Sequence, residues 1–340
     1  MPLEIVRNDI VNMQVDVIVN TANPKAIIGS GVDSAIHKKA GPKLIEERKQ
    51  IGDIKVGKAI ITSAYNLDAK YIVHVVSPIW IDGNHNEELL LRNCYKEALN
   101  LAKKYNCESI AFPLLATGNN EFPKSLALQI AINEISSFLM ENDMQVYLVV
   151  YNKEAFVLSE KLFSSIKSYI DENYIEERSY EEKTYDKLPS RLPDFSSLVS
   201  GRFRKAKQAT LEEFVGYDYG LENVLENLDA GFSETLLKLI DETGKKDSEV
   251  YKKANIDRRL FSKIKNNTDY RPSKTTAIAF ALALELDLNE TKDFIARAGY
   301  ALSNSSKFDV IIEYFIKHKN YNVFEINEAL FEFDQPLIGS

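Results

Sequence analysis

Short apolar runs alternate with helical patterns along the first half of the chain. Five continuously apolar runs, rich in β-branched residues, have the length of buried strands: Val15–Val19, Ile60–Thr62, Tyr71–Val76, Ile110–Ala116 and Val146–Tyr151. Between them, Glu87–Lys104 and Lys124–Met140 carry apolar residues at helical spacing. Strands that alternate with helices predict an α/β domain over residues 1–172, with a mixed, largely parallel sheet between helices. Ligands of such sheets bind in loops beyond the carboxyl ends of the strands.

The second half of the chain has a different pattern. Residues 173–228 combine an acidic run, two prolines and the cationic patch GRFRKAK, which predicts a partly ordered linker. Residues 229–340 predict an all-helical domain in short units, with a tail from Ser305 that is either core or a dimer surface. Four residues stand where helix caps and ends belong, namely Ser233, Asn289, Gly244 and Gly299.

Composition narrows the class of protein. A chain of 340 residues that is 45% apolar and 27% charged is expected to form about two globular domains. No apolar run approaches the roughly 18 residues of a membrane span, and no export signal is recognisable, so a cytoplasmic protein is expected. The two cysteines, Cys94 and Cys107, form no CxxC pair, and neither a metal nor a cofactor is expected. The net charge of −8 argues against general nucleic-acid binding by the whole chain.

The segment DVIVNTANPKAIIGSGVDSAIHKKAG carries the most informative motif. A buried strand ends at Asn20, and a loop with Asn23, Gly29 and Gly31 then leads into a helix near Val32. Glycines before a helix let backbone N–H groups approach a phosphate, and the helix N-terminus favours negative charge. The spacing therefore predicts an anion site that Asn23 and Asp33 can also reach.

This stretch resembles the signature VNAAN…GGGVDxAIH of the macrodomain family, and three further elements resemble family motifs in the same order. They are RNDI, GKAIITSAYNL with IVHVVSP, and FPLLATGNNEFP, so that the resemblance covers about residues 3–170. It implies a pocket for ADP-ribose or for ADP-ribosylated protein. His37 and His74 are expected to be structural residues.

The resemblance also implies individual roles. Asp9 would bind the adenine amine, with Ile10 packing nearby, and Tyr151 would stack on the adenine face. The diphosphate would lie between two loops. The first loop comprises Gly29, Ser30, Gly31 and Val32, and the second comprises Thr117, Gly118, Asn119, Asn120 and Glu121. Asn20 and Phe122 complete the set of expected ligand-binding residues.

Two residues decide between an enzyme and a binding module. Asn23 would hold the distal ribose, and Asp33 would orient or activate the attacking water. Hydrolytic macrodomains of the MacroD type have both residues, whereas many relatives that only bind lack the aspartate. The first reading is thus a hydrolase that removes mono-ADP-ribose from proteins or cleaves O-acyl-ADP-ribose. The alternative is a sensor of ADP-ribose or another NAD-derived metabolite that regulates transcription without turnover.

The two loops depart from the family pattern at three positions. Ser30 replaces the middle glycine of the first loop, Asn120 stands where an aromatic residue is frequent, and Glu121 stands where glycine is usual. A carboxylate beside a diphosphate is unfavourable unless it points away. These departures bear on affinity and rate rather than on the fold.

The short helices of residues 233–302 resemble the helix-turn-helix domain of Cro and lambda-repressor type regulators. DSEVYKKANIDRRLFSKIKNN would be the paired motif, although the usual glycine of its turn is missing. Over Ser233–Thr275 eleven Lys and Arg face seven Asp and Glu, a net charge of +4. The second helix would place five side chains toward DNA: Arg258, Arg259, Ser262, Lys263 and Lys265. A helical bundle that binds protein or forms a homodimer is the alternative.

Overall fold

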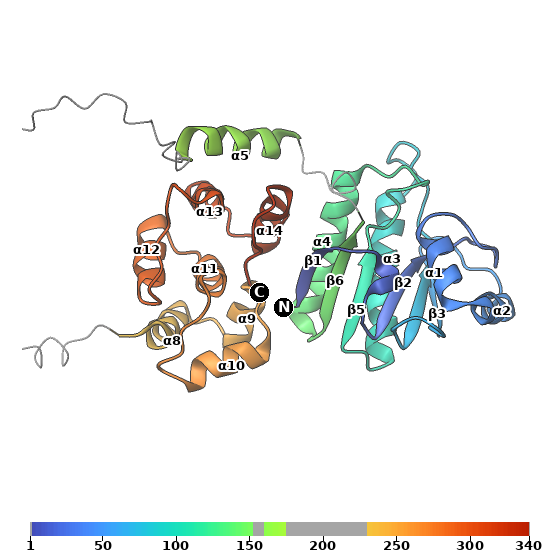
Figure 1. The fold of residues 1–340 in the computed structure, drawn as a ribbon, viewed down its shortest axis with the longest axis horizontal. Coiled ribbons are helices and arrows are strands. Elements are labelled where there is room, and N and C mark those ends of the chain that lie inside the picture. The colour runs from blue at the N-terminus through green and yellow to red at the C-terminus, as the bar shows by residue number, and fades with distance from the viewer. Residues whose placement is uncertain (1, 152–159, 175–229, 340) are drawn as a thin grey trace, which may run out of the picture. The chain divides into compact units, whose positions relative to one another are not determined.

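A six-stranded sheet forms the centre of the first half of the chain. The computed structural model describes residues 2–151, 160–174 and 230–339, so that almost all of the predicted linker lies outside the described residues. The sheet has the strand order β1-β6-β5-β2-β4-β3 (Figure 1). Its strands are β1 (Leu3–Arg7), β2 (Val17–Thr21), β3 (Ala59–Ser63), β4 (Tyr71–Val75), β5 (Ser109–Pro113) and β6 (Gln145–Val150).

The sheet is mixed and largely parallel, as predicted. Strands β1, β6, β5, β2 and β4 run parallel to one another, whereas β3 pairs with β4 in the antiparallel sense. The five predicted runs correspond to β2 through β6, with ends shifted by a few residues. Strand β1 was not predicted because it lies at the sheet edge, where LEIVR alternates between buried and half-buried positions.

Helices cover both faces of this sheet. The long helices α3 (Glu87–Lys104) and α4 (Lys124–Glu141) contact each other and pack on one face. The other face is covered by η1 (Ile10–Asn12), α1 (Val32–Ala40) and α2 (Pro42–Ile51). Because β2, β5 and β6 are parallel, their carboxyl ends lie at the same edge of the sheet. The loops that leave these ends carry the predicted motifs.

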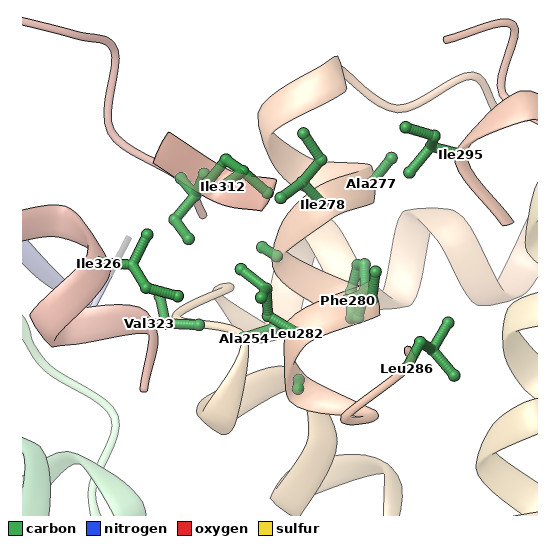
Figure 2. Close-up of a cluster of buried hydrophobic side chains, with 14 of the residues drawn as sticks. Ala254, Ala277, Ile278, Phe280, Leu282, Leu286, Ile295, Ile312, Val323 and Ile326 are labelled. Carbon is green, nitrogen blue, oxygen red and sulfur yellow. The ribbon is translucent and has the colours of Figure 1, made fainter. Parts of the chain in front are cut away.

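The second half of the described chain is entirely helical. Its core surrounds α11, where every residue from Thr276 to Ala283 is buried. Figure 2 shows α11 side chains in the middle of a hydrophobic cluster with residues of α12, α13 and α14. The helices are α5 (Glu160–Asn173), α8 (Phe232–Thr243), α9 (Asp247–Lys253), α10 (Arg258–Asn266), α11 (Lys274–Ala283), α12 (Leu288–Ala296), α13 (Lys307–Lys317) and α14 (Val323–Glu332).

Several details differ from the sequence-based expectations. Helix α5 contacts α13, and Ile166 and Ile170 belong to the helical core, although the sequence assigned them to the first domain. Ser233 is a buried residue inside α8, and α12 is capped by Asp287 rather than Asn289, in a capping box with Glu290. The tail after Ser305 contributes buried residues to the core. None of the helices that the structure describes is both long and apolar enough to cross a bilayer.

The turn between α9 and α10 is built around Asn255. This residue has φ +57°, a left-handed conformation that asparagine tolerates better than most residues. Its buried side chain accepts a hydrogen bond from Leu3 N–H (3.0 Å) and donates one to the Leu3 carbonyl (2.8 Å). One residue therefore closes the turn and satisfies two backbone groups of edge strand β1.

We expect Asn255→Gly to lower the free energy of unfolding by about 1–3 kcal/mol, because it leaves buried groups of Leu3 unpaired. Asn255→Ala should cost about 1 kcal/mol more, since a Cβ is unfavourable at this φ. Urea unfolding followed by circular dichroism measures both effects. Asn106→Gly is the matched control, an asparagine at φ +52° on the exposed surface. Equal stability of Asn255→Gly and the unaltered chain would contradict this role.

Candidate active site

A cavity of about 840 Å³ opens at the carboxyl ends of the central strands. Its floor includes Thr21 at the end of β2, Pro113 at the end of β5 and Val150 at the end of β6. Two loops, after β2 and after β5, form opposite sides. The volume lies within the range of small-molecule sites, and the position is the one at which α/β sheets bind ligands.

The first loop ends at the N-terminus of α1. Gly31 occupies the N-cap position with φ +62° and offers no side chain to cap the helix. The first N–H groups of α1 are therefore without a side-chain acceptor at the cavity, where Gly29 through Asp33 all contribute to the lining. Such a helix N-terminus attracts anions.

The second loop is a compact turn after β5. Glu121 N–H donates to the Gly118 carbonyl (2.9 Å), and Phe122 N–H donates to the Ala116 carbonyl (3.1 Å). Ala116 and Glu121 both have positive φ, +65° and +52°, so two non-glycine residues hold left-handed conformations here. The loop thus reaches the tight backbone that glycine would favour, at a conformational cost.

A side-chain hydrogen bond joins the two loops. Asn119 Nδ2 donates to Ser30 Oγ at 2.6 Å, and both residues line the cavity. The hydroxyl that departs from the family's glycine pattern therefore has a defined partner. This contact joins the two sides of the cavity.

Asp33 has a buried carboxylate whose orientation is fixed by hydrogen bonds. Its side chain is buried at the edge of the cavity, with the residue 2% exposed. Oδ2 accepts a hydrogen bond from Gly29 N–H (2.5 Å), and Oδ1 accepts one from Asn20 Nδ2 (2.6 Å). These donors orient the carboxylate and stabilise its charge. His37 Nε2 lies 3.5 Å from Oδ1, so Oδ2 is the oxygen that retains a further lone pair with which a water could be bound.

Asn20 connects Asp33 to the interior of the sheet. Its Nδ2 also lies 3.0 Å from His74 Nδ1, and His74 Nε2 lies 2.9 Å from Thr62 Oγ1. Because Nδ1 must accept from the amide, the contacts assign the neutral imidazole with its proton on Nε2. Asn20 is fully buried and belongs to this chain of contacts rather than to the ligand surface.

Asn23 and Arg48 form a second polar group beside the cavity. Asn23 Oδ1 accepts from Lys25 N–H (3.1 Å) in a local turn, and Asn23 is half-buried in the lining. The buried Arg48 guanidinium donates to the carbonyls of Asn23 (3.4 Å) and Pro24 (3.3 Å), and also to that of Gly52. Arg48 thereby fixes the backbone that presents Asn23.

Comparison with known proteins agrees with this geometry. A family model described as Macro domain matches residues 19–131. The chain is 45% identical over 166 residues to a macro domain-containing protein of Methanosarcina mazei, covering 48% of this chain and 89% of that protein. It is 42% identical over 168 residues to a Citrobacter rodentium protein named O-acetyl-ADP-ribose deacetylase, covering 48% of this chain and 95% of that protein. The chain belongs to the macro domain family.

A solved structure of the Oceanobacillus iheyensis macrodomain with ADP is 38% identical in sequence to the aligned part of this chain. The match has a TM-score of 0.42 and covers 50% of this chain and 92% of the other.

Most of the residues predicted for the macro domain pocket lie on its surface. The lining contains Asn23, Gly29, Ser30, Gly31, Val32, Asp33, Thr117, Gly118, Asn119, Asn120 and Tyr151. Tyr151 is 76% exposed at the end of β6 and is free to cover a ligand ring. Their roles toward a ligand stay predictions.

Five predicted ligand-binding residues lie outside the lining. Ile10 and Phe122 are buried in the two cores, and Asn20 is buried beside Asp33, so none of the three side chains lines the cavity. Glu121 is exposed and also lies outside the lining. Asp9 caps η1 by accepting from Val11 N–H (3.2 Å), and its adenine role stays a prediction.

The structure adds lining residues that the sequence did not reveal. They include Lys124 at the start of α4, Leu90 on α3 and four apolar side chains from two irregular segments, namely Val56, Pro78, Ile79 and Ile81. Irregular segments have no periodicity from which a common face can be inferred. Only the family-like stretch IVHVVSP pointed toward this part of the pocket.

A cluster of three potential metal ligands also borders the cavity. Asp82, His85 and Glu87 bring one ligand atom each within 4.8 Å of one another. However, Glu87 accepts four backbone N–H groups, of residues 81, 82, 83 and 85, so its carboxylate already closes the loop. Because Glu87 is engaged in this way, we assign the cluster no metal.

In the helical half, the predicted second helix of the paired motif exists as α10. Phe261 and Ile264 are buried, whereas the opposite face exposes the five predicted residues Arg258, Arg259, Ser262, Lys263 and Lys265. Lys265 is paired with Asp247 on α9 (2.6 Å), so its charge is partly compensated. A nucleic-acid role for this face stays a prediction.

Burial lowers the pKa of His74 to about 3, with the charges of His37 and Arg48 acting in the same direction. The folded state therefore resists protonation, whereas an unfolded imidazole titrates near 6.5. Stability from this group is complete above about pH 6.5. It falls by about 1.4 kcal/mol per pH unit below that value, down to about pH 3.

We expect His74→Gln to reduce the loss of stability between pH 6.5 and 4.5 by about 1.4 kcal/mol per unit, whatever its stability at neutral pH. Urea unfolding at a series of pH values gives this slope. His85→Gln, which replaces an exposed histidine, should leave the slope unchanged. If His74→Gln and the unaltered chain lose stability in parallel, His74 is not the neutral buried group described above.

Proposed function

We propose that the macro domain binds ADP-ribose in the cavity and hydrolyses its esters, either O-acyl-ADP-ribose or ADP-ribose on modified protein side chains. The observation that carries the proposal is the placement of Asn23 and Asp33 in one cavity with two phosphate-type loops. Relatives such as the Citrobacter rodentium protein are named O-acetyl-ADP-ribose deacetylase, and their identity of about 42% over the domain supports this choice.

In this proposal the diphosphate occupies the space between the first and second loops. The uncapped N-terminus of α1 and the backbone of Gly29–Gly31 would receive one phosphate, and Thr117–Asn119 the other. Tyr151 would cover the adenine ring at the exposed end of the cavity, with Asp9 near its amine. The distal ribose would then lie toward Asn23.

The chemistry assigned to Asp33 is general-base catalysis. Its carboxylate would polarise a water that adds to the ester carbonyl, after which the bond from the acyl carbon to the ribose oxygen breaks. The ribose oxygen takes up a proton, giving ADP-ribose and a carboxylic acid. Gly29 N–H and Asn20 keep the carboxylate oriented, so little reorganisation is needed at the moment of attack.

The alternative is a sensor that binds ADP-ribose without turnover. The firm engagement of Asp33 with Gly29 gives the carboxylate a structural role that a sensor would also need. Replacement by alanine would remove both roles at once. An isosteric replacement that keeps one acceptor oxygen separates them.

We expect Asp33→Asn to lower kcat on O-acetyl-ADP-ribose by about 10²–10⁴-fold, because the amide cannot take up a proton. Binding of ADP-ribose should change by less than about tenfold, since the loop keeps an acceptor at this position. Steady-state kinetics and titration calorimetry on the full chain measure the two quantities. Asp68→Asn, an exposed carboxylate outside the cavity, is the control.

Retained turnover in Asp33→Asn would contradict the base role. If the unaltered chain binds ADP-ribose but hydrolyses neither O-acetyl-ADP-ribose nor a mono-ADP-ribosylated protein, the sensor is correct instead. Absence of ADP-ribose binding would contradict both.

A second proposed function is nucleic-acid binding by the helical half. It is supported by α9 and α10, which are joined by a four-residue turn, and by the exposed cationic face of α10. A groove along this face is lined by Arg258, Arg259, Ser262, Lys263, Asn266 and Asn267, all hydrogen-bond donors suited to phosphates or base edges. A helical bundle that dimerises or binds protein is the alternative for this half.

We expect the double variant Arg258→Glu, Lys263→Glu to bind duplex DNA at least tenfold more weakly at low salt. The dependence of log K on log salt should fall by about two, because two phosphate contacts are lost. Fluorescence anisotropy with a mixed-sequence duplex measures both.

The control variant Lys238→Glu, Lys292→Glu has the same charge change on exposed faces of α8 and α12. No salt-sensitive retention by the unaltered chain, or equal losses in both variants, would contradict DNA binding by α10. Sedimentation of the same samples would then test dimerisation.

A further inference from the structure

One side of the macro domain cavity is apolar beyond the two loops. We call this surface the apolar wall, formed by Val56, Ile79, Ile81 and Leu90, all of which line the cavity. Ile79 and Ile81 are 66% and 64% exposed. Single exposed isoleucines are common on proteins, but a group of aliphatic side chains inside a ligand cavity is typical of a binding surface.

The wall is tied to the second loop through Asn120. Asn120 Nδ2 donates to the carbonyls of Ser77 (3.0 Å) and Pro78 (3.0 Å), and Trp80 N–H donates to the Asn120 carbonyl (2.8 Å). The segment that carries Ile79 and Ile81 is thus held beside Asn120 of the second loop.

The other part of the wall is tied to Asn23. Ile54 N–H donates to the Pro24 carbonyl (2.9 Å), which places Val56 close to the turn that presents Asn23. Leu90 packs against Gly57, where even an added Cβ would lie 3.0 Å from Leu90 Cδ2. The wall therefore connects the turn of Asn23, toward which the distal ribose is proposed to lie, with Asn120 of the second loop.

The loop that carries Ile81 is held in place by Glu87. Glu87 Oε1 accepts from the N–H groups of Ile81 (3.3 Å) and Gly83 (3.2 Å), and Oε2 accepts from His85 N–H (2.6 Å). With these bonds the carboxylate is occupied by backbone donors and gives the wall a rigid support. Preorganised apolar surface binds with a small ordering cost.

From this placement we infer that the apolar wall binds the acyl chain of an O-acyl-ADP-ribose, and that acyl groups longer than acetyl are preferred. The inference rests on the proposed function of the same cavity. Water adds to the acyl carbonyl, and the bond between the acyl carbon and the ribose oxygen breaks. The ribose oxygen takes up a proton and becomes a hydroxyl group, and the acyl group is released as a carboxylic acid. Water is the only co-reactant that this reaction needs. The length of the acyl chain affects kcat/KM only through the burial of its methylenes against the apolar wall.

The experiment compares kcat/KM of the full chain for O-acetyl-, O-propionyl- and O-butyryl-ADP-ribose. Each buried methylene should raise kcat/KM by about threefold to fourfold, so the ratio of butyryl to acetyl is expected to be on the order of ten. In the double variant Ile79→Asn, Ile81→Asn this ratio should fall toward one. Both side chains are largely exposed, so the fold does not depend on them.

Leu89→Asn is the matched control, because Leu89 is 55% exposed on α3 and lies outside the cavity lining. It should leave the ratio at the value of the unaltered chain. A ratio near one in the unaltered chain, or an undiminished ratio in Ile79→Asn, Ile81→Asn, overturns the inference while the hydrolase proposal stands.

Two further outcomes separate this inference from the proposed function. If no ester is hydrolysed, calorimetry with ADP-ribose and O-butyryl-ADP-ribose still tests the wall, which predicts tighter binding of the butyryl ester by about tenfold. Equal affinities would then overturn the inference as well. If Ile79→Asn, Ile81→Asn slows release of ADP-ribose from modified protein but leaves the acyl ratio unchanged, the wall receives a protein substrate and the acyl assignment is wrong.

Discussion

The buried carboxylate of Asp33 holds together the parts of the macro domain that meet at the cavity. A buried charge is tolerated only where hydrogen-bond donors compensate for lost water, and here these donors are Gly29 N–H and Asn20 Nδ2. The first donor fixes the conformation of the phosphate loop, and the second joins α1 to strand β2. The hydrogen bond between Gly29 N–H and Asp33 therefore both compensates the buried carboxylate and fixes the conformation of the first loop.

The interior of the macro domain was largely predictable from sequence because its strands are buried on both faces. Continuous apolar runs such as Ile110–Ala116 leave few alternatives, and α3 follows from its periodicity. The edge strand β1 lacks this signal. Motif resemblance identified the loops but could not distinguish a lining residue such as Asn23 from a buried one such as Asn20, since depth below a surface depends on contacts distant in sequence.

The helical half illustrates the same division between local and distant information. Helix α10 was predicted from the resemblance of DSEVYKKANIDRRLFSKIKNN to a paired helical motif, and the structure has a helix over Arg258–Asn266. The structural role of Asn255 could not be predicted from the neighbouring sequence, since its side chain binds the backbone of Leu3, 252 residues away. Its departure from the usual glycine is compatible with the turn because asparagine accepts positive φ, and the same side chain satisfies the edge of the sheet.

The departures at the two phosphate loops can be understood in similar terms. Ser30 adds a hydroxyl where glycine is usual, and this hydroxyl accepts a hydrogen bond from Asn119 across the cavity. A neutral hydrogen bond that is exposed to water contributes only about 0.5–1.5 kcal/mol, so a diphosphate with several backbone donors can displace it. Before the ligand arrives, however, the bond orders both loops at once. Part of the conformational entropy that binding would otherwise cost is then already lost in the free protein.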